Sequence, residues 1–231
     1  MSLVVGWLTE DFVAIASDGK AIANEENGNG SLLGEEVLKF HLFTPNIIIA
    51  AAGDKEFFDV LVRSLQPLVE QSRGDEQLFA YLTTAIPLAA QGLLRCSPTH
   101  NEDLRLLGYD ATQKRFRCLG WNRSENFVEH EILYGRVLVM GFGEASKTLA
   151  RELARGRLSQ IKNLGEVRPT LEEVIREVSA LVSERIDGNV TSCLIYRENG
   201  DEGAHTDETR VELDSTGHID LAGDSLYSGN P

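Results

Sequence analysis

Basic residues are scarce in this chain relative to acidic ones. Its 231 residues include 22 lysines and arginines against 36 aspartates and glutamates, which gives a formal net charge of −14 at pH 7. A protein this acidic repels the phosphate backbone of nucleic acids and anionic lipid surfaces. Nucleic acid is therefore not expected as a partner.

Cysteines and long apolar runs are also few. The three cysteines, Cys96, Cys118 and Cys193, are far apart and odd in number, so they form neither a disulfide framework nor a CxxC metal pair. No apolar run approaches the roughly 20 residues that span a bilayer, and the start lacks the pattern of a signal peptide. We expect a cytoplasmic protein without membrane association. The five histidines show no metal-ligand spacing, so no metal or organic cofactor is expected.

The composition that remains is that of an ordinary globular protein, with 42% apolar residues. The length suits one large domain with a tail, and we place the domain at residues 1–198. Residues 199–231 are Gly-rich and acidic and predict a peripheral appendage, in which TRVELDSTGHIDL suits one small hairpin.

The predicted elements alternate between strands and pairs of helices. Two hairpins open the chain, one around the turn TED and one around TPN, and helices follow over about 54–71 and 76–94. A meander of strands then leads to a helix over about 144–157. A further helix is predicted to start at PTLEE, where Thr170 and Glu173 suit a capping box, and strands follow it.

The first strands are apolar at nearly every position, unlike strands with one wet face. Both faces of their sheet must therefore be covered. Because the connections are hairpins, the sheets are antiparallel, and the covers are a second sheet on one side and helices on the other. The sequence predicts an α+β fold, a four-layer αββα sandwich with two antiparallel sheets.

Ser2 and Asp18 occupy matching positions in the first hairpin. A three-residue TED loop places Ser2 opposite Asp18, and a two-residue loop shifts the pairing by one position. Methionine before serine is normally removed, which would leave Ser2 with both a hydroxyl and a free α-amine. An amine of pKa about 7.7–8.0 is a suitable base for activating that hydroxyl.

Two further residues suit the same chemistry. Lys39, within the apolar run VLKFHLF, needs a carboxylate partner, and Asp18 is the nearest candidate in this topology. Its positive charge would lower the pKa of the amine. Gly53 ends the strand IIIAAAG before a helix start, where its N–H is suited to hold a developing oxyanion.

These residues resemble a known family. SLVVGWLTEDFVAIASDGK, LKFHLF and IIIAAAGD are similar to the β-type proteasome subunits and their bacterial relatives HslV and Anbu, which are N-terminal-nucleophile (Ntn) hydrolases. The resemblance covers about residues 2–197. It implies the αββα fold, Ser2 as nucleophile, Asp18 and Lys39 as charge-relay partners and Gly53 as oxyanion donor. In SERIDGNVTSCLIY it also implies a supporting role for Asp187.

The chain also departs from that family. Where many relatives carry a serine near the terminal amine, this chain has Phe142, and after Asp187 it lacks the usual serine and paired glycines. The loop between Asp18 and Lys39 is about five residues longer than usual, and a one-residue slip would turn Lys39 to the other face. Near Phe142, GFGEASKT fits neither glycine-rich phosphate-loop pattern.

We therefore expect a serine- or threonine-type peptidase that cleaves peptide bonds in a peptide or protein substrate. The family resemblance implies a homo-oligomeric ring or helical assembly, with an unfoldase partner that the sequence does not identify. The alternative is a catalytically inactive structural subunit of such an assembly, silenced by retention of Met1 or by the change at Phe142.

Overall fold

The computed structural model describes residues 3–22, 32–36, 38–94, 102–141, 143–182, 189–197, 205–213 and 219–220. These ranges contain α-helices and short 3₁₀ helices, here given in chain order: α1 (Lys55–Gln71), α2 (Leu78–Leu94), η1 (Arg123–Glu125), α3 (Glu144–Leu158), η2 (Leu164–Glu166) and α4 (Val167–Leu181).

The strands form two main sheets and one small pair, all with antiparallel neighbours. The six-stranded sheet has the order β10 (Val137–Gly141), β1 (Leu3–Leu8), β2 (Phe12–Asp18), β11 (Val190–Tyr196), β12 (His205–Leu213) and β13 (Ile219–Asp220). The five-stranded sheet has the order β5 (Phe40–Thr44), β6 (Ile47–Ala52), β7 (Asp103–Asp110), β8 (Arg115–Asn122) and β9 (His130–Glu131). The small pair is β3 (Lys20–Ile22) with β4 (Leu32–Glu36).

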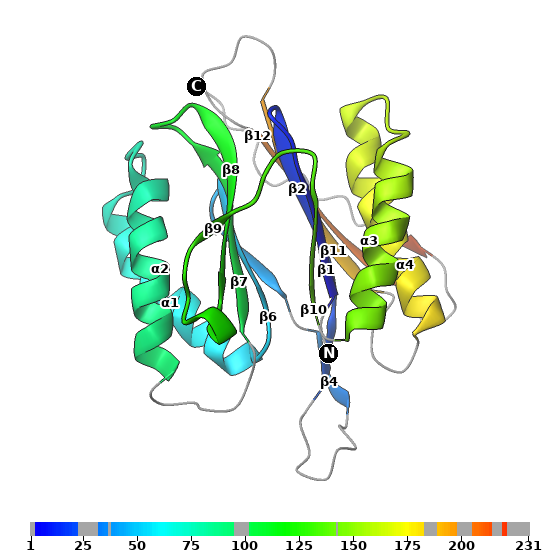
Figure 1. The fold of residues 1–231 in the computed structure, drawn as a ribbon, viewed down its shortest axis with the longest axis horizontal. Coiled ribbons are helices and arrows are strands. Elements are labelled where there is room, and N and C mark those ends of the chain that lie inside the picture. Colours follow the sequence, from blue (N-terminus) through cyan, green and yellow to red (C-terminus); the bar gives the residue numbers. More distant parts are fainter. Residues whose placement is uncertain are drawn as a thin grey trace.

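The helices cover the outer faces of the two main sheets. Helices α1 and α2 lie against the five-stranded sheet, α3 and α4 lie against the six-stranded sheet, and the two sheets face each other (Figure 1). The structure thus confirms an α+β arrangement of two main antiparallel sheets and four helices in the described ranges.

Burial on both faces of the first strands explains their continuous apolar sequence. Val4 lies in the cluster between the sheets, whereas Val5 lies in the cluster beneath α3 and α4, and both are fully buried. Burying such side chains is worth roughly 1.5–3 kcal/mol each. The strand is therefore held from two sides, and its ends are fixed in place.

The pairing of β1 with β2 places Val4 opposite Ser17, which is the register expected for a two-residue loop and one position away from that of a three-residue TED loop. The predicted helix start at PTLEE, in contrast, needs correction. Helix α4 begins at Val167 instead of at the PTLEE motif, and no side chain caps it, so Thr170 lies inside the helix and forms no capping box. The buried Val167 adds an apolar contact to the first turn, which favours the earlier start.

The region that the sequence marks as an appendage contributes strands to the larger sheet. β12 pairs along its length with β11, from Val190 opposite Val211 to Tyr196 opposite His205. β12 in turn pairs with β13, as Leu213 lies opposite Ile219.

None of the helices in the described ranges combines the length and the apolar character needed to cross a bilayer.

Candidate functional site

The first hairpin places Asp18, the last residue of β2, beside the start of β1. Its turn is closed by the Thr9 side chain, whose Oγ1 accepts hydrogen bonds from the amides of Asp11 and Phe12 at 3.3 and 3.1 Å. At the other end of the hairpin, the Leu3 N–H donates to Asp18 Oδ1 at 2.6 Å. The carboxylate therefore fixes the backbone at the beginning of the described chain.

Lys39 is the partner of Asp18, as the sequence predicts. Its Nζ lies 2.5 Å from Asp18 Oδ1, and the two side chains are 4% and 0% exposed. Lys39 lies just before β5, and its carbonyl accepts the Ala51 N–H of β6 at 2.9 Å. The ion pair thus joins the two main sheets across the interior, because Asp18 belongs to one and Lys39 precedes the first strand of the other.

One oxygen of this carboxylate is less well satisfied than the other. Oδ1 accepts from both Leu3 and Lys39, whereas the buried Oδ2 has no hydrogen-bond partner among the described residues. A buried carboxylate oxygen without a donor is costly, because it has lost its hydration without replacement. Within the described residues, the burial of this carboxylate is therefore only partly compensated.

Gly53 lies at the junction between β6 and α1. Its φ of 154° and its exposure distinguish it from the buried alanines before it. Asp54 caps α1 by accepting from the amides of Glu56 at 2.7 Å and Phe57 at 3.2 Å. The positive end of the α1 dipole therefore adjoins Gly53, which favours negative charge there.

Two of the sequence-predicted residues, Ser2 and Asp187, lie outside the described residues, as does Phe142. The segments next to them nevertheless converge. Leu3 pairs with Gly141, and Val190 pairs with Asp18. The chain just after Ser2, just before Phe142 and just after Asp187 therefore meets at the Asp18 end of one sheet.

Sequence reasoning missed Glu102, which the structure places beside Gly53. Its carboxylate accepts the Asp54 N–H, with 3.2 Å to Oε1 and 3.1 Å to Oε2. Burial is the main cause that raises the pKa of Glu102, to about 7. The only signal in the sequence is an acidic residue directly before an apolar strand, and that pattern is typical of an ordinary surface position.

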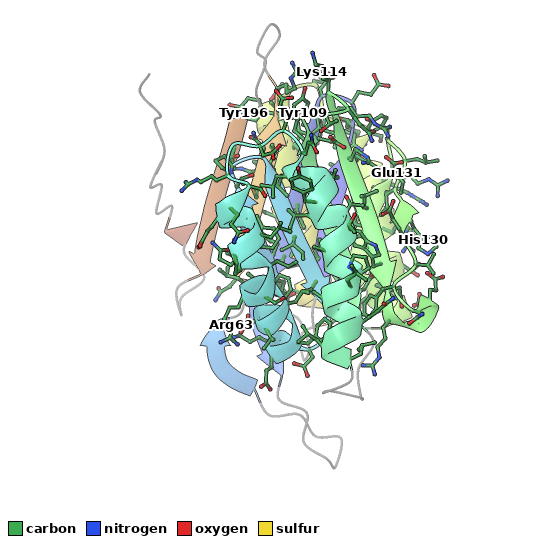
Figure 2. All side chains as sticks on the ribbon, turned by 90° about the vertical axis from the view of Figure 1, so that its left-hand side faces the viewer. Arg63, Tyr109, Lys114, His130, Glu131 and Tyr196 are labelled. Atoms are coloured by element: carbon green, nitrogen blue, oxygen red, sulfur yellow. The ribbon has the colours of Figure 1, made fainter. Side chains whose placement is uncertain are left out.

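A cavity of about 400 Å³ lies between the start of β5 and helix α1. The residues on either side of Lys39 contribute to it, together with one face of α1, and its full lining is Leu38, Phe40, His41, Phe58, Asp59, Val62 and Arg63. Arg63 is labelled on α1 in the view onto the α1 and α2 layer (Figure 2). Burial lowers the pKa of His41.

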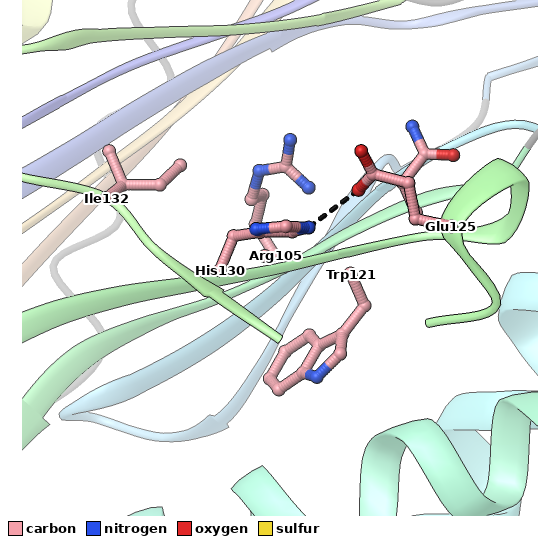
Figure 3. Close-up of a pocket in the computed structure, with 7 residues that line it drawn as sticks. Arg105, Trp121, Glu125, His130 and Ile132 are labelled. Atoms are coloured by element: carbon pink, nitrogen blue, oxygen red, sulfur yellow. Dashed lines mark hydrogen bonds and ion pairs between the residues drawn. The ribbon is translucent and has the colours of Figure 1, made fainter. Parts of the chain in front are cut away.

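A second cavity, of about 200 Å³, lies beside β8 and β9. His130 Nε2 lies 2.6 Å from a Glu125 carboxylate oxygen there (Figure 3). Arg105 is ion-paired with Asp103. Both side chains thus have carboxylate partners. No cluster of His, Cys, Asp and Glu in the described ranges is arranged to hold a metal ion.

No protein-family model matches the chain, and no curated protein gives a significant match.

Proposed function

We propose that the protein is a proteasome-like Ntn hydrolase, an amidohydrolase that cleaves peptide bonds with Ser2 as its N-terminal nucleophile. The observation that carries the proposal is the buried pair of Asp18 and Lys39, in which one carboxylate oxygen holds both the lysine and the amide of Leu3. The residue that adjoins Ser2 is thereby fixed beside a buried ammonium group.

The proposed reaction begins at the Ser2 hydroxyl, after removal of Met1. The α-amine of Ser2 takes the hydroxyl proton, directly or through one water, as Oγ bonds to the carbonyl carbon of the substrate amide. The Lys39 ammonium lowers the pKa of that amine and stabilises the alkoxide. Asp18 orients Lys39, and its second oxygen is available to a donor at the terminus.

The oxyanion that forms on the substrate would be held by the Gly53 N–H at the start of α1. Collapse of this intermediate breaks the C–N bond, and the amine leaves with the proton taken from Ser2. Water then hydrolyses the resulting ester and regenerates the hydroxyl. Asp187 would support the terminus, and no metal or organic cofactor takes part.

The cavity between the start of β5 and α1 would receive a substrate side chain next to the cleaved bond. Phe58 and Val62 give it an apolar wall, and Asp59 and Arg63 give it charges of both signs. Such a lining favours a side chain with an apolar stem and a polar end. We further propose a homo-oligomeric ring or helical assembly in the cytoplasm, served by an unfoldase.

The test is the intact mass of the protein expressed without an N-terminal tag, before and after incubation with a β-lactone or epoxyketone probe. We expect loss of Met1 and one probe adduct, absent in Ser2→Ala and retained in the control Ser159→Ala, which removes an exposed serine hydroxyl on another element. Retained Met1 with no adduct would overturn the proposal and favour an inactive structural subunit.

A further inference from the structure

Glu102 anchors the backbone directly after Gly53. Asp103 pairs with Ala52, so Glu102 lies beside the end of β6, and its carboxylate spans the Asp54 N–H with both oxygens. Gly53 is thus fixed on both sides, by the β6 ladder before it and by the Glu102 carboxylate after it. A glycine without such anchors has more backbone freedom than any other residue.

This anchor is itself held firmly in the fold. Glu102 is 1% exposed, and its carbonyl accepts the Arg123 N–H at 3.0 Å. The charged groups that act on its carboxylate are Asp54, whose charge raises its pKa, and Arg123, whose charge lowers it. A carboxylate buried this deeply costs free energy, and the bond to Asp54 is the compensation that the structure shows for it.

The bond to Asp54 has a consequence for the Gly53 amide. An oxyanion donor contributes most when it is already oriented before the reaction, because reorientation during the reaction would cost free energy. We propose that Glu102 is a positioning residue: its carboxylate fixes the Gly53–Asp54 peptide, and together with the β6 ladder this limits rotation about the Gly53 φ and ψ. The Gly53 N–H, which belongs to the preceding Ala52–Gly53 peptide, thereby keeps its orientation toward the oxyanion. This inference rests on the proposed function.

The test compares Glu102→Leu with Glu102→Gln in the full-length protein. Leucine cannot accept from the Asp54 N–H, whereas the glutamine side-chain oxygen can. Glu172→Gln serves as the matched control, because Glu172 is also a buried carboxylate and accepts from Ser192, on the opposite side of the fold. Two quantities are measured: hydrogen exchange at the Asp54 amide, and the rate of covalent reaction with the β-lactone probe.

We expect Glu102→Leu to speed exchange at Asp54 at least tenfold and to slow the covalent reaction by about tenfold to a hundredfold, less than the loss of a whole oxyanion donor. For a peptide substrate the loss would appear in kcat, with KM nearly unchanged. Glu102→Gln would restore most of the rate. The Glu172→Gln control would leave both quantities at their wild-type values.

The possible failures are distinguishable. Faster exchange at Asp54 with an unchanged rate of covalent reaction would overturn the inference and leave the proposed function standing. A wild-type protein that forms no adduct would overturn both. If Glu102→Leu does not fold, Glu102→Asp keeps the charge but is one methylene too short to reach the Asp54 amide, and a wild-type rate in that folded variant would equally overturn the inference.

Discussion

Two buried ion pairs at different places in the fold differ in how completely their carboxylates are satisfied. In the first, Asp110 Oδ2 accepts from Arg117 at 3.0 Å and Oδ1 accepts from the Gln113 N–H at 3.1 Å. Arg117 also donates to Glu131 at 3.0 Å and lies over the ring of Phe79. In the second, Asp18 uses one oxygen twice and leaves the other without a donor in the described part of the chain.

The difference separates a structural network from a candidate reaction site. A fully hydrogen-bonded network stabilises one packing arrangement and has no capacity for a ligand. A buried carboxylate oxygen without a donor lowers stability, unless a further group completes it.

Loss of the lysine at the incomplete pair should have the largest effect. Lys39→Met leaves the Asp18 charge buried and unpaired, so the free energy of unfolding should fall by about 3–5 kcal/mol. The rate of covalent reaction with the probe should fall by at least about 100-fold, because a group that assists proton transfer is lost. Urea unfolding and intact-mass kinetics measure the two effects.

The double variant Asp18→Asn with Lys39→Met serves as the control for that result. Removing both charges should return much of the lost stability, because no uncompensated charge stays buried, but it should not return the reaction. A Lys39→Met protein that reacts at the wild-type rate would refute a chemical role for the pair.

Loss of the arginine at the complete network should affect stability alone. Arg117→Ala removes the charge-assisted hydrogen bonds to Asp110 and Glu131, and the free energy of unfolding should fall by about 2–4 kcal/mol. The rate of covalent reaction per folded molecule should not change. A slowed reaction in a fully folded Arg117→Ala protein would show that the pair of Arg117 and Asp110 is not purely structural.

Glu102 should make stability depend on pH, since burial raises the pKa of its carboxyl group from 4.5 to about 7. Between these pH values the folded state binds more protons than the unfolded state, so stability falls as the pH rises through this window. Glu102→Gln removes that dependence. Relative to wild type, the variant should gain at most about 3 kcal/mol between pH 4 and pH 8.

The measurement is thermal or urea unfolding of both proteins at several pH values in that range. Parallel curves for wild type and Glu102→Gln would mean that Glu102 does not carry the raised pKa.

Much of this architecture could be predicted because strong local patterns coincide with tertiary constraints. The continuous apolar sequence of strands such as β1 predicts a covering layer on each face. In the structure, Val4 and Val5 are buried on opposite faces of that strand. The pair of Asp18 and Lys39 could be predicted because a lysine in an apolar run must find a carboxylate, and the hairpin topology leaves one candidate.

Other features could not be predicted because they depend on long-range contacts. The hydrogen bond from the Asp54 N–H to Glu102 joins residues 48 positions apart, with two helices between them in the sequence, and no spacing rule predicts it. The early start of α4 at Val167 reflects packing beneath the sheet, which overrides the local capping motif at Thr170. The roles predicted for Ser2 and Asp187 stay predictions.

The smallest effect is expected at an exposed ion pair, because charges in contact with water interact more weakly than buried charges. Lys55 and Asp59 lie 2.6 Å apart in the first turns of α1, with side chains 45% and 43% exposed. Lys55→Ala should change the free energy of unfolding by no more than about 0.5 kcal/mol, because water and salt screen the pair and its ordering costs side-chain entropy. Unfolding at low and at high salt measures this directly. A loss comparable to that of Lys39→Met would mean that burial is not what distinguishes the exposed pair from the pair of Asp18 and Lys39.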